Sequence, residues 1–136
     1  MPVTARPCYK PAMILSRTLP AATLALALLL PAAARPEVPE ILAVEAFRTG
    51  MGWRIDVTLE HPDAGWDHFA DAWEVLDDAG NRLGFRELMH PHVEEQPFTR
   101  SLYNVMLPDG LRRIHVRARC SQDGWNDETF AIDLEP

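Results

Sequence analysis

Cysteine and lysine are almost absent from this chain. Among 136 residues there are two cysteines, Cys8 and Cys120, and the single lysine is Lys10. Acids outnumber bases, with 20 Asp and Glu against 13 Lys and Arg. Because nucleic acid and anionic lipid are themselves negatively charged, this composition disfavours both as partners.

Familiar catalytic motifs are also missing. The sequence has no nucleophile elbow, paired-acid constellation, phosphate-binding loop or dinucleotide fingerprint. Gly80 and Gly84 belong to a predicted turn and the strand after it, and no helix start follows them. Hydrolytic catalysis therefore has little support, and the sequence leaves open whether the protein is an enzyme.

The chain lacks an apolar run long enough to span a membrane comfortably. A basic stretch at residues 1–17 precedes a short apolar run at 19–30 and an Ala-x-Ala exit ending at Ala34. This order predicts a signal peptide over residues 1–34 and a periplasmic or secreted protein with no membrane contact after cleavage. There is no twin arginine, and no cysteine stands at the exit of the segment for lipid attachment, since Cys8 lies far upstream. Met13 is an alternative start, and an uncleaved N-terminal anchor stays open.

The remaining residues, 35–136, alternate as β-strands do. Trp53 to Glu60 places apolar side chains on one face, and Arg113 to Cys120 does the same with Ile114, Val116, Ala118 and Cys120. We predict seven strands, at 40–47, 53–60, 69–76, 83–89, 101–107, 113–120 and 128–134, and no convincing helix. Such regular short strands indicate one all-β domain, an immunoglobulin-like antiparallel β-sandwich.

Strand direction predicts where the histidines gather. If consecutive strands alternate up and down, His61, His68, His90, His92 and Cys120 all fall at one end of the domain. Imidazole and thiolate are ligands for iron, copper and zinc, so we expect a transition-metal site at this rim, with iron or copper as candidates. His115 lies in mid-strand and is left out.

Two acidic residues are candidates for orienting these ligands. Glu94 and Glu95 follow the His90-Pro91-His92 run, and carboxylates often accept the second N–H of a metal-bound imidazole. A solvated loop edge is the plainer interpretation of the same pair.

Cys120 has no intramolecular partner once Cys8 is removed. An unpaired cysteine in an oxidising compartment suggests a metal thiolate, a reactive thiol or an intermolecular disulfide. It is equally consistent with a small buried hydrophobic residue. The alternation places Cys120 on the buried face, which argues against a freely reactive thiol.

Two motifs resemble the superoxide reductase (desulfoferrodoxin/neelaredoxin) domain. His61-Pro62 is followed by His68-Phe69 and a strand with Trp73-Glu74-Val75, as in that family's His-Pro…His-aromatic segment. The run from Arg119 to Trp125 resembles the family's Cys-Asn-x-His-Gly-x-Trp ending. The resemblance covers roughly residues 52–134.

This resemblance implies an immunoglobulin-like sandwich that holds one non-haem iron through four histidines and one cysteine and reduces superoxide to peroxide. His61, His68 and Cys120 match ligand positions of the family. Asp123 stands where the family has its last histidine, and no histidine precedes His61 to match the first ligand. His90 and His92 are additional imidazoles that would rebuild the site in another geometry.

A function without metal is the alternative. Immunoglobulin-like sandwiches also serve as adhesion, chaperone or accessory modules, because fold does not determine function. The rim segment 93–100 would then be a docking edge for a periplasmic protein partner.

Overall fold

The computed structural model describes residues 33–135, and these contain β-strands and turns but no helix. No helix within this range is therefore long and apolar enough to cross a membrane. The predicted signal peptide, residues 1–34, lies almost wholly outside the described residues, and its cleavage site stays a prediction.

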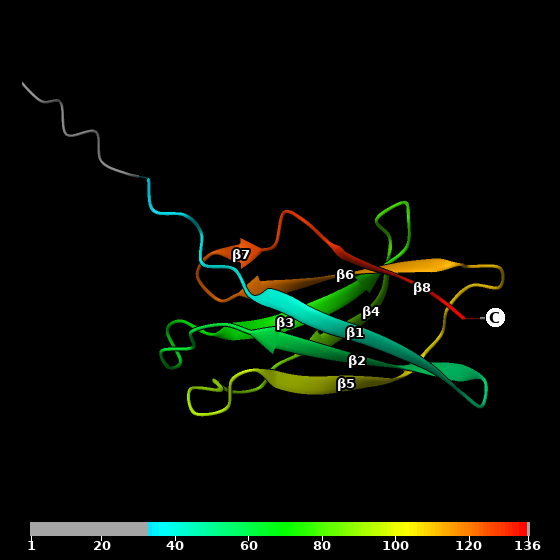
Figure 1. Cartoon of the computed structure of the whole chain (residues 1–136), viewed down its shortest axis with the longest axis horizontal. Coiled ribbons are helices and arrows are strands. Elements are labelled where there is room, and N and C mark those ends of the chain that lie inside the picture. The colour runs from blue at the N-terminus through cyan, green and yellow to red at the C-terminus, as the bar shows by residue number, and fades with distance from the viewer. Residues whose placement is uncertain (1–32, 136) are drawn as a thin grey trace, which may run out of the picture. The chain divides into compact units, whose positions relative to one another are not determined.

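Within residues 33–135 eight strands form two antiparallel sheets. Figure 1 shows how these strands are arranged. The first sheet has the order β1-β2-β5, and the second has the order β4-β3-β6-β7, with β8 also pairing with β6. The strands are β1 (Glu40–Thr49), β2 (Gly52–Glu60), β3 (Ala70–Leu76), β4 (Arg82–Glu87), β5 (Phe98–Val105), β6 (Arg113–Cys120), β7 (Gly124–Trp125) and β8 (Phe130–Asp133). The predicted all-β class and two-sheet sandwich are confirmed, while the immunoglobulin-like assignment stays a prediction.

The core lies between the two sheets and follows the predicted alternation. On β2 the side chains of Ile55, Val57 and Leu59 are fully buried, while the residues between them are partly exposed. Alternate residues of β6 are buried in the same way, down to Cys120 at its end. Because side chains of a strand alternate between its two faces, this phase fixes which residues can reach the interior.

Strand β3 departs from simple alternation because both of its faces are covered. Its outer face holds Glu74, which is only 1% exposed and accepts hydrogen bonds from Arg82 on β4 and Arg117 on β6. The guanidinium carbon of Arg117 lies over the ring of Trp125, 5.0 Å from the ring centroid. These long side chains shield the carboxylate of Glu74 from water.

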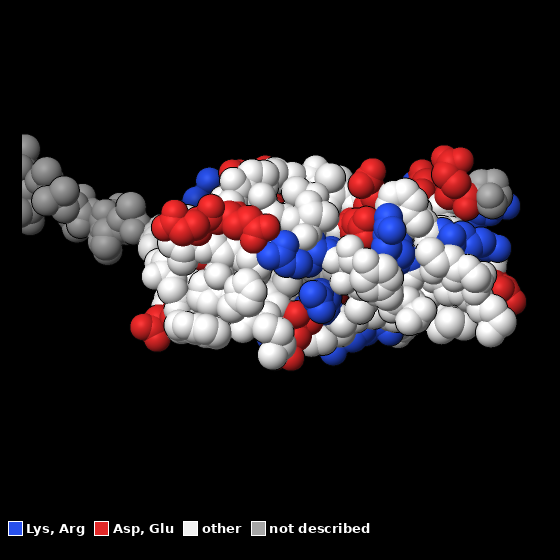
Figure 2. Space-filling model, turned by 90° about the horizontal axis from the view of Figure 1, so that it is seen from below, with Lys and Arg blue, Asp and Glu red and all other residues white. Residues whose placement is uncertain are grey.

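Charges of both signs lie side by side on the surface. On the face drawn in Figure 2, arginines are interspersed with acidic residues and with uncharged ones. Among the described residues, Arg100 pairs with Glu95 and Arg113 with Asp133, at 2.9 Å and 2.7 Å.

Two details of the predicted strands need correction. The hairpin after β6 forms an additional short strand, β7, in a segment that the sequence predicts to be a loop. Strand β5 begins at Phe98 rather than at Ser101, since Phe98 is 2% exposed and pairs with Leu59 of β2. The burial of Phe98 extends the sheet into part of the predicted docking segment 93–100.

The loops that follow β2, β4 and β6 lie at the same end of the sandwich, at the left of Figure 1. The segment before β1 reaches this end as well, because Glu37 hydrogen-bonds there to Asp123. Antiparallel pairing of the strands produces this arrangement, and it brings the predicted site residues into one neighbourhood.

Candidate metal centre

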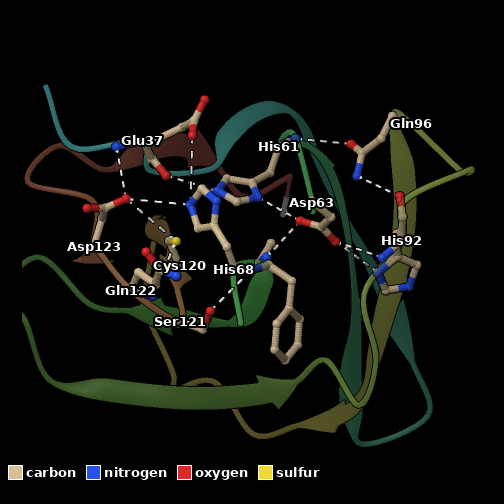
Figure 3. A network of polar contacts seen from close by, with 12 residues as sticks. Glu37, His61, Asp63, His68, His92, Gln96, Cys120, Ser121, Gln122 and Asp123 are labelled. Atoms are coloured by element: carbon tan, nitrogen blue, oxygen red, sulfur yellow. Dashed lines mark hydrogen bonds and ion pairs between the residues drawn. The ribbon is translucent and has the colours of Figure 1, made fainter. Parts of the chain in front are cut away.

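His61, His68 and Cys120 converge at this end of the sandwich (Figure 3). One potential ligand atom from each residue lies within 4.8 Å of the other two. His61 directly follows β2, His68 precedes β3, and Cys120 is the last residue of β6. Both sheets therefore contribute to the cluster, which their packing holds together.

The ring of His61 is buried and fixed at both nitrogens. Nδ1 lies 2.6 Å from Oδ1 of Asp63, and Nε2 lies 2.9 Å from the backbone carbonyl oxygen of Glu37. A carboxylate can only accept, so Nδ1 donates its hydrogen to Asp63. The carbonyl oxygen of Glu37 also only accepts, so an ion bound at Nε2 would take the place of the hydrogen that Nε2 donates to it.

Asp63 is a buried carboxylate that sequence reasoning missed. Besides the His61 ring it accepts backbone hydrogen bonds from Ala70 at 2.9 Å and from His92 at 2.7 Å. Metal-binding histidines usually donate their second N–H to a carboxylate of this kind. The only sequence signal for this role is the position of Asp63 two residues after His61. In the structure these residues form a tight turn, in which the backbone N–H of Asp63 donates to the carbonyl oxygen of His61 at 2.8 Å.

Glu94 and Glu95, the acids predicted for that role, do not orient a ligand. Both are exposed, and Glu95 instead forms an ion pair with Arg100 at 2.9 Å. Their place in the chain next to His92 suggested proximity, but their side chains point toward solvent.

His68 stands edge-on to His61, with ring centroids 5.0 Å apart. Its Nε2 is buried and has no hydrogen-bond partner among the described residues. The nearest carboxylate oxygens are Oδ2 of Asp123 at 3.6 Å and Oε2 of Glu37 at 3.8 Å, both beyond hydrogen-bonding distance. Because an unsatisfied buried nitrogen is costly, this atom is the clearest sign that the cluster can accept a ligand.

The thiol of Cys120 is buried, as the alternation predicts, and only 1% of the residue is exposed. It forms no disulfide with any residue of the described range. Its Sγ accepts the backbone N–H of Gln122 at 3.4 Å, and its S–H donates to Oδ2 of Asp123 at 3.8 Å. The sulfur is therefore held between the Gln122 amide and the Asp123 carboxylate, at the end of β6.

His90 and His92 lie at the same end but outside the cluster. His92 is 4% exposed and stacks on Phe98, with ring centroids 3.9 Å apart. His90 is exposed, and its ring centroid lies 4.6 Å from that of His92. Of the five expected ligands, His61, His68 and Cys120 lie together and His90 and His92 do not join them, while metal binding by any of the five stays a prediction. Asp63 separates the two groups, since it binds the His61 ring on one side and the His92 backbone on the other.

Burial lowers the pKa of His92, and the positive charge of Arg100 lowers it further. Neither ring nitrogen of His92 has a hydrogen-bond partner within residues 33–135. His115, which the sequence excludes from the site, bonds instead to Asp78 and Thr129.

The cluster has the chemistry of a transition-metal site. Two imidazoles and a thiolate suit copper, iron and zinc, and a carboxylate, Asp123, lies next to two of the three. The four imidazoles of a superoxide reductase centre are not assembled here, because His90 and His92 are turned to other partners. The residues present fit an ion with three or four protein ligands.

The fold and the cluster together define a small β-sandwich with a His₂Cys group at one end. In sequence, the chain is 40% identical over 86 residues to a protein of Halomicrobium mukohataei described as "Putative lipoprotein". The matched region is 63% of this chain and 42% of that relative, so the chain spans less than half of the relative's length. No protein-family model and no solved structure matches the chain significantly.

Proposed function

We propose that this protein is an exported β-sandwich that binds one transition-metal ion through His61, His68 and Cys120. The observation that supports this most directly is the approach of three ligand atoms, from three separate segments, to within 4.8 Å of one another. The buried Nε2 of His68 adds to it, since a bound ion would satisfy this atom.

Export is supported by two independent features. The basic and apolar N-terminal segment has the order of a signal peptide. The similar protein from Halomicrobium mukohataei is described as a lipoprotein, and lipoproteins are exported proteins. A periplasmic or secreted location follows from this proposal.

A redox role is the finer form of the proposal. His61, His68 and Cys120 coincide with three ligand positions of the superoxide reductase family, which the motifs around them resemble. An iron ion held by a thiolate there would supply one-electron reduction of superoxide to peroxide. The protein's own residues would bind the ion, bury the sulfur and, through Asp63, fix the orientation of the His61 ring.

The experiment is a metal analysis of the protein purified from cells expressing the full chain, without chelator and without affinity histidines. Stoichiometric metal that disappears in His61→Ala and Cys120→Ser supports the proposal. His115→Ala is the matched control, because this imidazole lies outside the cluster. A thiolate charge-transfer band with iron would further justify a superoxide assay.

The alternative is an interaction module that needs no metal. Exposed apolar side chains near the site end, including Trp66 at 69% and Met89 at 68%, favour this second function. Absence of metal even after reconstitution with iron, copper and zinc would overturn the metal proposal. A search for a bound partner would then use Trp66→Ala as the test variant.

A further inference from the structure

The environment of the cluster points to a particular fourth ligand. We infer that Asp123 completes the site as a carboxylate ligand and that its charge makes the site selective for divalent ions over Cu(I). This inference rests on the proposed metal site and specifies the ion that the site would take.

The hairpin between β6 and β7 positions Asp123. Cys120 pairs with Gly124 across a loop of three residues, and Gly124 has a φ of 82°, which glycine adopts without strain. This tight loop turns the side chain of Asp123 back toward the sulfur that precedes it. The backbone N–H of Glu37 donates to Oδ2 of Asp123 at 3.2 Å and holds the carboxylate in place.

Distances support ligation by Asp123. Its Oδ2 lies 3.6 Å from Nε2 of His68 and 3.8 Å from Sγ of Cys120. Around a tetrahedral ion with bonds of about 2.0–2.3 Å, neighbouring donor atoms are roughly 3.3–3.8 Å apart. These two separations are those of ligands that share one ion. The oxygen is too far from Nε2 of His68 for a hydrogen bond, whereas it accepts the S–H of Cys120, whose hydrogen a bound ion would replace.

Glu37 is the competing carboxylate, and it is placed less well. Its Oε2 approaches only one of the three cluster residues, His68, at 3.8 Å, and its side chain is 56% exposed. The side chain of Asp123 is 34% exposed and faces two of them. Glu37 takes part mainly through its backbone, which contacts both Asp123 and the ring of His61.

Charge then decides which ion is preferred. Neutral imidazoles, a thiolate and a carboxylate carry two negative charges, because metal ligands bind in their deprotonated forms. A divalent ion neutralises this set, whereas Cu(I) leaves one negative charge in a largely buried site, where uncompensated charge is costly. Without Asp123 the remaining His₂Cys set carries a single negative charge and would suit Cu(I) instead.

The test compares Co(II), as a coloured stand-in for zinc and iron, with Cu(I) in the full-length protein and its variants. Asp123→Asn should lower Co(II) affinity by about 100-fold or more, because loss of an outer contact alone costs 10–100-fold. Its Cu(I) affinity should stay the same or rise, because the soft thiolate and imidazole donors remain and the uncompensated negative charge is removed. Glu37→Gln is the matched control and should leave both affinities and the Co(II) spectrum unchanged.

Two further outcomes distinguish a failure of Asp123 as the fourth ligand from a failure of the metal site itself. If wild type binds Co(II) with a thiolate charge-transfer band and Asp123→Asn keeps both the affinity and the ligand-field bands, the fourth ligand is wrong and the metal site stands. If wild type shows no such band, the metal site itself fails. Should Asp123→Asn not fold, Asp123→His substitutes a different ligand and should shift the ligand-field bands; an unshifted spectrum overturns the inference.

Discussion

Oδ1 of Asp63 lies 2.6 Å from Nδ1 of His61, and both side chains are completely buried. The same carboxylate holds the backbone of His92 and the first residue of β3, Ala70. One side chain thus ties the loop after β2 to two other segments and fixes the direction in which the His61 ring faces. Asp63 therefore lies outside the cluster but contacts one of its three side chains directly.

Asp63→Asn should weaken metal binding by about 10–100-fold, the usual effect of altering an outer partner of a metal ligand. The amide oxygen can keep the contacts of only one carboxylate oxygen, because the amide nitrogen would face a donor, either Nδ1 of His61 or the N–H of His92, at the other position. Titration with Co(II) would measure the affinity, and thermal unfolding without metal would measure the structural part. Equal affinity in the variant and wild type would show that the contact does not orient the ligand.

Removal of each histidine at the rim should separate ligands from neighbours. If the proposed site exists, His61→Ala and His68→Ala should abolish stoichiometric metal, because each removes one of the three potential ligand atoms of the cluster. His90→Ala should retain it, since this ring is exposed and stands next to His92 rather than the cluster. Elemental analysis of the purified variants is the measurement. Loss of metal in His90→Ala would mean that the loop rearranges to bring it in.

Stability should fall on mild acidification because of His92. Its folded-state pKa is lowered by burial and by the positive charges of Arg100 and His90, against the opposite effect of Glu95 and Asp63. The folded protein therefore binds this proton less readily than the unfolded chain, whose pKa is about 6.5. The stabilising contribution is complete above that value and is lost as the pH falls from it through the lowered pKa.

Chemical denaturation from pH 7.5 to pH 5 would measure this effect in wild type and in His92→Phe. The aromatic replacement keeps a ring stacked on Phe98 but cannot be protonated. Its stability should therefore depend less steeply on pH over this range. Parallel curves for the two proteins would assign the acid sensitivity to other groups.

Glu74→Gln should destabilise the fold by about 1.5–3 kcal/mol, since hydrogen bonds to charged groups contribute that much. The buried carboxylate accepts from Arg82 and Arg117, and the amide can accept at only one of its two positions. Urea unfolding would measure the change. Glu45→Gln, at an exposed position of β1, is the control, and its free energy of unfolding should stay within about 0.5 kcal/mol of wild type. A similarly small change in Glu74→Gln would show that the hydrogen bonds from Arg82 and Arg117 to Glu74 add little to the free energy of unfolding, because water would solvate the two arginines equally well.

Much of the fold could be predicted because strand periodicity is local information. The alternation around Ile55 and Val116 correctly assigns their buried faces, and it places Cys120 in the interior. Boundaries were less predictable: β5 extends to Phe98 because its ring packs on His92, a contact that no local pattern encodes. The short strand β7 likewise depends on pairing with β6 rather than on its own propensity.

By itself the sequence determined the all-β class, the phase of the core and the end of the domain where the imidazoles and the thiol would lie. Antiparallel alternation is enough for this, since strand direction and side-chain face follow from residue order. Only the tertiary structure decided that His61, His68 and Cys120 meet while His90 and His92 turn to other partners. It also brought Glu37 to Asp123, 86 residues further along the chain, because loop conformation and sheet packing set ångström distances that residue order does not encode.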